Sequence, residues 1–151
     1  MASRPRDLEH LPCAAGTLRR ASRSLARLYD AHLTRAGLTT TQFSILKALE
    51  RNGGSAPLAE LNEELVFERT SLYRALAPLR RGRLVTIGSG RDRRVKVVAL
   101  TPRARRRIGA AMPHWRAAQR AVVGRFGARA WTSLASDLRA LTGLARAAQA
   151  E

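Results

Sequence analysis

The sequence is poor in features that define several other classes of protein. Cys13 is its only cysteine, so no disulfide can form within the chain, and we expect a cytoplasmic location. The first ten residues lack the apolar core of an export signal. The longest uncharged run, residues 36–46, is too short to cross a bilayer, so we expect no membrane partner.

Motifs for enzymatic or cofactor chemistry are also missing. The three histidines lie at no metal-ligand spacing with Cys13, so we expect no metal site. No nucleophile–base pattern, glycine-rich phosphate loop or pair of catalytic carboxylates is present. A thiol peroxidase built on Cys13 would lack a resolving cysteine and an obvious base. We therefore expect neither an enzyme nor a cofactor.

Acidic residues are scarce and unevenly placed. The chain has 28 Lys and Arg against 11 Asp and Glu, a formal charge of +17. Residues 69–107 hold thirteen of the basic residues and one acid, Asp92, whereas residues 48–68 hold five glutamates and only Arg51. A uniformly solvated surface would not separate the signs in this way. The sequence therefore predicts that one face binds a polyanion, with nucleic acid as the leading candidate.

Apolar spacing and capping residues predict four helices in the first half of the chain. They begin near Leu18, Thr39, Pro57 and Glu68. Thr39 and Gln42 form a capping box, and the first helix should end near Gly37. In the fourth helix Leu72 and Leu76 should face inward. Pro78 near its end costs a backbone hydrogen bond, so we expect the helix to be effective only over its first turns. The residues left for a partner at its start or on its open side are Arg69, Thr70, Ser71 and Arg74.

Residues 84–101 have the pattern of a β-hairpin. Two strands are expected over residues 84–87 and 95–100, joined through the glycines of IGSGRD. Alternation places Val95, Val97 and Ala99 on one face, which we expect to rest on the helices. Helices joined by tight turns and followed by a basic hairpin make a winged helix-turn-helix, in which the fourth helix enters the major groove and the wing reaches the minor groove. The wing residues expected to contact DNA are Arg91, Asp92, Arg93, Arg94 and Lys96.

The C-terminal third predicts two further helices. Thr101 and Pro102 mark the start of the first, which Pro113 should kink or split. Gly124 and Gly127 should bracket a turn before a last helix with an apolar seam. These terminal helices need a partner surface, and a second copy of the chain is the simplest one, since two-fold dimers match palindromic half-sites.

Four segments together resemble the MarR family of dimeric winged-helix transcription regulators. They are GLTTTQFSIL, ERTSLYRAL, GRDRR and ALTPRARRRI. The resemblance implies a mainly α fold with a small β-hairpin wing, in a single domain over residues 1–151. It also implies dimerisation helices over residues 11–37 and 102–151 around a DNA-binding lobe over residues 38–101. It implies a repressor released by a small ligand or by oxidation, in which Asp92 steadies Arg94 at the minor groove.

The segment LPCAAGTLRR resembles the first helix of the oxidation-sensing branch of that family. Cys13 matches the first cysteine of a paired sensor, and Ala15 stands where the second would be. Cys13 is therefore a candidate redox residue, and the alternative is a small buried residue near a helix start. Tyr29 and His32 are candidates to polarise a thiolate or to line a ligand pocket, with core packing as their alternative role. Ala15 favours a ligand-responsive protein in which Cys13 is at most a modulating thiol.

The leading interpretation is a dimeric transcriptional repressor that binds a specific palindromic operator in double-stranded DNA. The alternative from another class is a non-specific basic nucleic-acid-binding protein, associated with chromatin or RNA, for which the charge alone would suffice. The confinement of the basic residues to one segment beside a helix-turn-helix favours the repressor.

Overall fold

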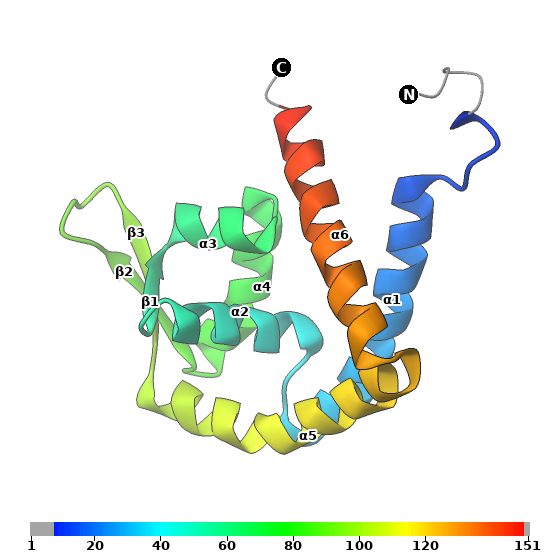
Figure 1. Ribbon diagram of the computed structural model, residues 1–151. Helices are drawn as coiled ribbons and strands as arrows, with labels where there is room; N and C mark the ends of the chain where they lie inside the picture. Colours follow the sequence, from blue (N-terminus) through cyan, green and yellow to red (C-terminus); the bar gives the residue numbers. More distant parts are fainter. Residues whose placement is uncertain (1–7, 150–151) are drawn as a thin grey trace.

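Six α-helices and one small sheet form the part of the chain that the structure, a computed structural model, describes, residues 8–149 (Figure 1). The helices are α1 Ala14–Leu33, α2 Thr40–Arg51, α3 Leu58–Leu65, α4 Arg69–Arg81, α5 Pro102–Phe126 and α6 Ala128–Ala147, with a 3-10 turn η2, Thr34–Ala36, after α1. The strands are β1 Ser55–Pro57, β2 Val85–Ser89 and β3 Lys96–Leu100. This order confirms the predicted fold class, a mainly helical chain with a small β wing.

Local capping chemistry fixes the helix starts that the sequence predicted. The Thr39 hydroxyl accepts a hydrogen bond from the backbone N–H of Gln42 at 3.2 Å, and the Gln42 side chain accepts one from the Thr39 N–H at 3.0 Å. The Thr101 hydroxyl accepts from the Ala104 N–H at 3.1 Å at the start of α5. Each bond satisfies an N–H group that the first helical turn leaves without an intrahelical partner.

The sheet has three strands rather than the predicted two. β1 pairs antiparallel with one edge of β3, and β2 pairs antiparallel with the other. The sequence analysis missed β1 because it has only three residues and ends in proline. β1 leads directly into α3, so this pairing joins the wing to the helix that precedes α4.

The face of β3 that packs on the helices is the opposite of the predicted one. Val98 is fully buried, with Ala56 and Ile87 as its partners on the two neighbouring strands. Val95 is 40% exposed, so the expectation that Val95, Val97 and Ala99 face the core is wrong. Because side chains alternate along a strand, Lys96 shares the inner face with Val98 and lies beside the helices.

The core is entirely apolar. Fully buried side chains from α2, α3 and α4 meet the inner face of the sheet. They include Ile45, Leu46, Leu49, Leu61 and Leu76. With the side chain of Arg69 left aside, no polar or charged residue among residues 8–149 is buried, so these charges lie at or near the surface.

The two prolines expected to disturb helices leave both helices continuous, so Pro113 does not split its helix. α5 runs through Pro113 without a break, and Pro113 and Gly109, whose carbonyl loses its N–H partner, are both exposed to solvent. α4 likewise includes Pro78 and continues to Arg81. Gly124 lies within α5, and the turn into α6 rests on Gly127 alone, whose φ of 98° suits glycine.

Helix α6 and the N-terminal part of α1 stand apart from the compact lobe, whereas Leu33 at the end of α1 belongs to the core. Figure 1 shows α5 passing beneath the lobe, with α1 and α6 rising at the end opposite the wing. No residue of α6 is buried, and Leu134, Leu141 and Leu144 are 37%, 38% and 69% exposed. Toward its end α6 returns to the lobe, where the Arg146 guanidinium donates to the Glu63 carbonyl. None of the described helices is both long and apolar enough to span a membrane.

Candidate nucleic-acid interface

Helix α4 presents a polar face to solvent. Leu72, Leu76 and Leu79 are buried at helical spacing and fix the rotation of the helix on the core. Thr70, Ser71 and Arg74 are exposed on its outer side, as the sequence predicted. Arg69 is the first residue of α4, and its side chain lies outside the described part of the structure. The exposed groups can donate to and accept from base edges.

The wing tip is a tight turn held by its own backbone. The Gly90 N–H donates to the Val95 carbonyl at 2.8 Å, and the Val95 N–H donates to the Asp92 carbonyl at 3.0 Å. The Asp92 carboxylate accepts from the backbone N–H of Arg94 at 2.9 Å. Asp92 therefore stabilises the turn that carries Arg94 and forms no ion pair with the Arg94 guanidinium.

The cations of the wing project into solvent. Arg91, Arg93, Arg94 and Lys96 are all exposed. Ion pairs in the described part of the chain join Lys47 to Glu50 and Arg51 to Glu64, and neither lies in the wing. The positive charge of the wing is thus available to a polyanion.

Two arginines at the start of α5 have structural contacts. The Arg107 guanidinium donates to the Ala36 carbonyl at 2.9 Å and lies against Gly37, and the Arg105 guanidinium lies against Gly54. A β-carbon at either glycine would force the neighbouring guanidinium group to shift. Arg105 and Arg107 thus pack α5 against the turns of the lobe.

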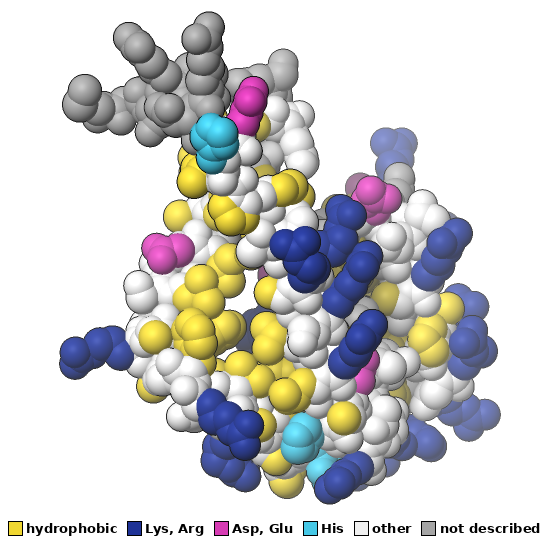
Figure 2. All heavy atoms as spheres, turned by 90° about the vertical axis from the view of Figure 1, so that its right-hand side faces the viewer, with side chains coloured by type: hydrophobic (Ala, Val, Ile, Leu, Met, Phe, Trp, Pro, Cys, Tyr) yellow, Lys and Arg dark blue, Asp and Glu magenta, His cyan; other side chains and the backbone are white. Residues whose placement is uncertain are grey.

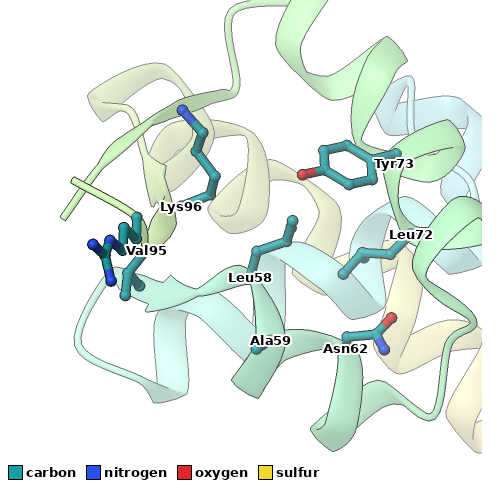
Figure 3. A pocket seen from close by; sticks show the side chains of 8 residues that line it. Leu58, Ala59, Asn62, Leu72, Tyr73, Val95 and Lys96 are labelled. Carbon is teal, nitrogen blue, oxygen red and sulfur yellow. The ribbon is translucent and has the colours of Figure 1, made fainter. Parts of the chain in front are cut away.

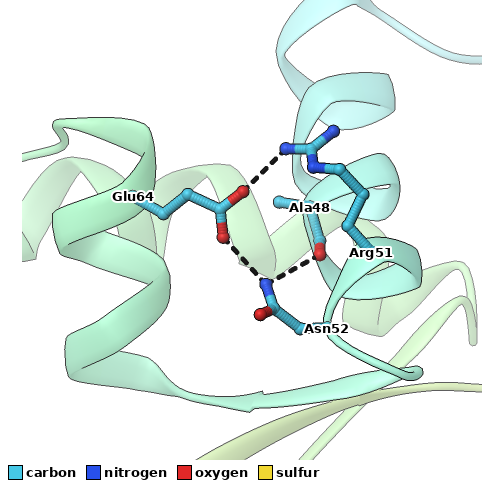
Figure 4. Close-up of polar contacts among 4 residues, drawn as sticks. All are labelled: Ala48, Arg51, Asn52 and Glu64. Atoms are coloured by element: carbon cyan, nitrogen blue, oxygen red, sulfur yellow. Dashed lines mark hydrogen bonds and ion pairs between the residues drawn. The ribbon is translucent and has the colours of Figure 1, made fainter.

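The sequence analysis missed a polar cluster between α2 and α3 (Figure 4). One Glu64 oxygen accepts from the Arg51 guanidinium at 2.7 Å, and the other accepts from the Asn52 amide at 2.8 Å. The Asn52 amide also donates to the Ala48 carbonyl at 2.9 Å. The hydrogen bond from Arg51 holds the pKa of Glu64 below its ordinary value. The cluster ties the end of α2 to the helix that positions α4.

An apolar cavity of about 670 Å³ lies between the terminal helices and the lobe. Figure 2, which faces the α1 and α6 end of the molecule, shows hydrophobic side chains around a hollow there. Its lining includes Tyr29, Phe43, Trp115, Gln119, Trp131 and Leu138. The Tyr29 hydroxyl donates to the Gln119 side-chain oxygen, and burial raises the pKa of Tyr29. The rings of Phe43 and Trp115 stack with centroids 6.4 Å apart, so Trp115 packs against the core.

The structure separates the three candidate redox or ligand residues. Tyr29 lines the cavity, whereas His32 is half-buried and is not part of its wall. Cys13 is exposed and caps α1, where its sulfur accepts from the Gly16 N–H at 3.4 Å, so the alternative of a buried structural cysteine is wrong. Cys13 and Tyr29 are sixteen residues apart, mostly along one helix, about 24 Å at 1.5 Å per residue. Tyr29 and His32 therefore cannot polarise the thiolate of their own chain.

A polar-faced helix after a short turn, followed by a basic three-stranded wing, defines a winged helix-turn-helix DNA-binding protein. The sequence pattern of the MarR family matches residues 36–95. MosR of M. tuberculosis, solved in complex with DNA, is 37% identical, with 90% of this chain and 98% of MosR covered and a TM-score of 0.81. This chain belongs to the MarR family of transcriptional regulators.

More distantly similar solved structures share the fold. E. coli MarR, solved as a mutant with operator DNA, is 19% identical over 84% of this chain and 91% of its own, with a TM-score of 0.74. Bordetella bronchiseptica BpsR, whose DNA binding is regulated by 6-hydroxynicotinic acid, is 21% identical over 86% and 93%, also with a TM-score of 0.74. No curated protein sequence matches the chain at a significant level. The match to the MarR family and the similarity to MosR make the chain a DNA-binding transcriptional regulator, and a non-specific nucleic-acid binder is not favoured.

Proposed function

We propose that the protein is a homodimeric repressor that binds a palindromic operator and leaves it when a small ligand occupies the cavity between the terminal helices and the lobe. The observation that carries the proposal is the exposed polar face of α4 beside a wing tip whose cations form no ion pair with a described acidic residue. A protein that bound DNA by charge alone would need no such pairing of a helix with a wing.

The proposed DNA contacts divide between the two grooves. Thr70, Ser71 and Arg74 are exposed along α4 and supply hydrogen-bonding groups for base edges in the major groove. Arg69 at the start of α4 is included on sequence grounds. The wing supplies Arg91, Arg93, Arg94 and Lys96 to the adjacent minor groove and backbone, and Asp92 shapes the turn.

Dimerisation through α1, α5 and α6 is supported by the apolar surface that a single chain leaves exposed. Leu18, Phe126, Leu134, Leu141 and Leu144 all lie on these helices and are between 37% and 69% exposed. Contiguous apolar surface of this kind marks an interaction site, and a two-fold partner would present both α4 helices to successive half-sites. We assign residues 11–37 and 102–151 to dimerisation and residues 38–101 to DNA binding.

The cavity supports regulation by a small apolar molecule. Its walls come from α1, α2, α5 and α6, so an occupant would touch both the terminal helices and the lobe. Tyr29 and Gln119 offer a polar pair for orientation within an otherwise apolar wall, the usual composition of a ligand site. Cys13 lies outside this cavity and has no second cysteine in its chain, which favours a ligand over an oxidant. A cytoplasmic location follows from the role.

Footprinting on the DNA upstream of the protein's own gene tests the proposal. We expect a protected palindrome with half-sites about one helical turn apart. Even protection along the fragment would show a general nucleic-acid binder instead.

A further inference from the structure

A groove runs between α4 and the wing. It consists of two adjoining cavities of about 460 and 420 Å³ that share the side chains of Tyr73 and Lys96. Arg94 lines the first cavity and Arg80 lines the second. Neither cavity is lined by an acidic residue of the described part of the chain. We refer to this feature as the α4–wing groove.

We propose that the α4–wing groove binds the sugar–phosphate backbone of one DNA strand, with Tyr73 and Lys96 on the same phosphate. This inference rests on the proposed function, which places α4 in the major groove and the wing in the adjacent minor groove. The two grooves of a duplex are separated by one strand of backbone. That backbone must pass between the helix and the wing, where the α4–wing groove lies.

The chemistry of the two shared side chains suits a phosphodiester. Tyr73 is 41% exposed although it is a large aromatic residue, and Figure 3 shows its hydroxyl directed into the space between α4 and β3. A tyrosine hydroxyl can donate to a phosphate oxygen while its ring packs against the sugar. Lys96 extends from β3 on the other side and adds a compact positive charge. Leu58 and Leu72 supply an apolar floor.

The side-chain oxygen of Asn62 needs a hydrogen-bond donor, which a phosphate cannot supply. Its side-chain oxygen is buried without a hydrogen-bond partner among the described residues, and Asn62 lines the cavity that holds Arg94. Phosphate oxygens only accept hydrogen bonds, so they cannot satisfy a second acceptor. A water that donates one hydrogen to Asn62 and the other to the phosphate would satisfy both, and the cavity has room for it.

The composition of the chain allows a direct test. Lys47 and Lys96 are the only lysines, and Tyr29 and Tyr73 are the only tyrosines, so each groove residue has one counterpart outside the groove. Acetylation of the wild-type protein, read by mass spectrometry with and without a random-sequence duplex, should show Lys96 protected and Lys47 unprotected. Inorganic phosphate at matched phosphate concentration should protect neither lysine. Equal protection of Lys96 by inorganic phosphate would identify a free-anion pocket and overturn the assignment to the DNA backbone.

Two substitutions measure the contacts separately. On the same random duplex, Lys96→Gln should weaken binding roughly three- to tenfold and reduce the slope of log Kobs against log salt by about 0.9 for each subunit engaged. Tyr73→Phe should weaken binding roughly two- to tenfold with the slope unchanged, because the lost donor is neutral. Lys47→Gln, at a lysine outside the groove, should leave both quantities as in wild type. Thermal melts verify that each variant is folded.

The proposal fails if a folded Lys96→Gln variant keeps the wild-type affinity and salt slope, or if bound duplex leaves Lys96 as reactive as before. These outcomes differ from failure of the proposed function. Phosphate contacts act on every sequence, whereas the proposed function fails only if the protein shows no preference for an operator.

Discussion

The carboxylate of Asp30 accepts two hydrogen bonds from Thr40, one from its backbone N–H at 2.6 Å and one from its hydroxyl at 2.7 Å. Asp30 lies in α1, and Thr40 is the first residue of α2, so one acidic side chain joins a terminal helix to the DNA-binding lobe. A carboxylate at a helix N-terminus is further favoured by the helix dipole. Thr40 also lines the apolar cavity, which places this joint within reach of an occupant.

Thr40→Val tests the joint, because it keeps the shape of the side chain and removes the hydroxyl. We expect the free energy of unfolding to fall by about 1 kcal/mol, measured by urea denaturation. Thr132→Val is the matched control, since the Thr132 hydroxyl bonds only to the Ala128 carbonyl within α6. Its effect should stay within about 0.5 kcal/mol. Equal effects of the two substitutions would show that the Asp30 contact contributes nothing.

The wing turn separates two roles, one for Arg94 and one for Asp92. Arg94→Ala should weaken operator binding by about 1–3 kcal/mol without affecting the fold, because it removes a minor-groove contact. Asp92→Asn should retain most of the affinity, since the amide oxygen can still accept from the Arg94 N–H, whereas Asp92→Ala should lose more. Fluorescence anisotropy with labelled operator measures all three, with Arg129→Ala on α6 as an exposed control. Wild-type affinity in a folded Arg94→Ala variant would contradict the wing assignment.

Arg74 is expected to read bases. Arg74→Ala should lower affinity for the operator more than affinity for random DNA, and selection from a pool of duplexes should show relaxed preference at one base position. A phosphate contact would behave differently. Equal losses on operator and random DNA would identify Arg74 as part of the backbone-binding surface.

Glu64 predicts a dependence of stability on pH. The hydrogen bond from Arg51 is the main reason that the pKa of Glu64 in the folded protein lies below the ordinary 4.5. The ionised carboxylate therefore stabilises the fold fully above pH 4.5, and this stabilisation is lost as the pH falls through the lowered pKa. At neutral pH, Glu64→Gln should cost about 0.5 kcal/mol, since a third of the side chain is exposed. The difference from wild type should shrink below pH 4.5. Glu63→Gln on the same helix should show no such trend; a parallel trend would contradict the role of Arg51.

Cys13 distinguishes the two kinds of signal. If a ligand in the cavity is the signal, Cys13→Ser should bind operator and respond to that ligand as wild type does. Peroxide should cause at most a partial release of the wild-type protein, because a single exposed thiol has no partner cysteine in its chain. Operator binding by gel shift, with and without peroxide, measures this. Full release by peroxide that Cys13→Ser abolishes would establish oxidation as the signal.

Local chemistry explains why much of the fold could be predicted. The Thr39 capping box depends on residues three apart, and Thr101 with Pro102 marks a helix start through capping and a fixed φ. The leucines of α4 repeat at helical spacing, so the exposed face with Thr70, Ser71 and Arg74 followed from periodicity alone.

The errors arose where tertiary context decides. In VKVVAL both alternating faces contain valine, so only pairing of Val98 with Ala56 and Ile87 selects the inner face. The pairing of β1 with β3 and the contact between Glu64 and Arg51 are non-local, and no sequence pattern announces either one. The sequence analysis did not select Tyr73, which directly follows the buried Leu72 in α4. Only the position of the wing in the structure shows that Tyr73 borders a groove.

The most direct test of the account is the ratio of dissociation constants of the wild-type dimer for its footprinted operator and for a random duplex of equal length, measured at one fixed ionic strength. A charge-driven binder and a sequence-specific repressor differ in this quantity even when their affinities for DNA are similar. We predict that the operator binds at least roughly 10³-fold more tightly than random DNA. A ratio close to one would contradict the account.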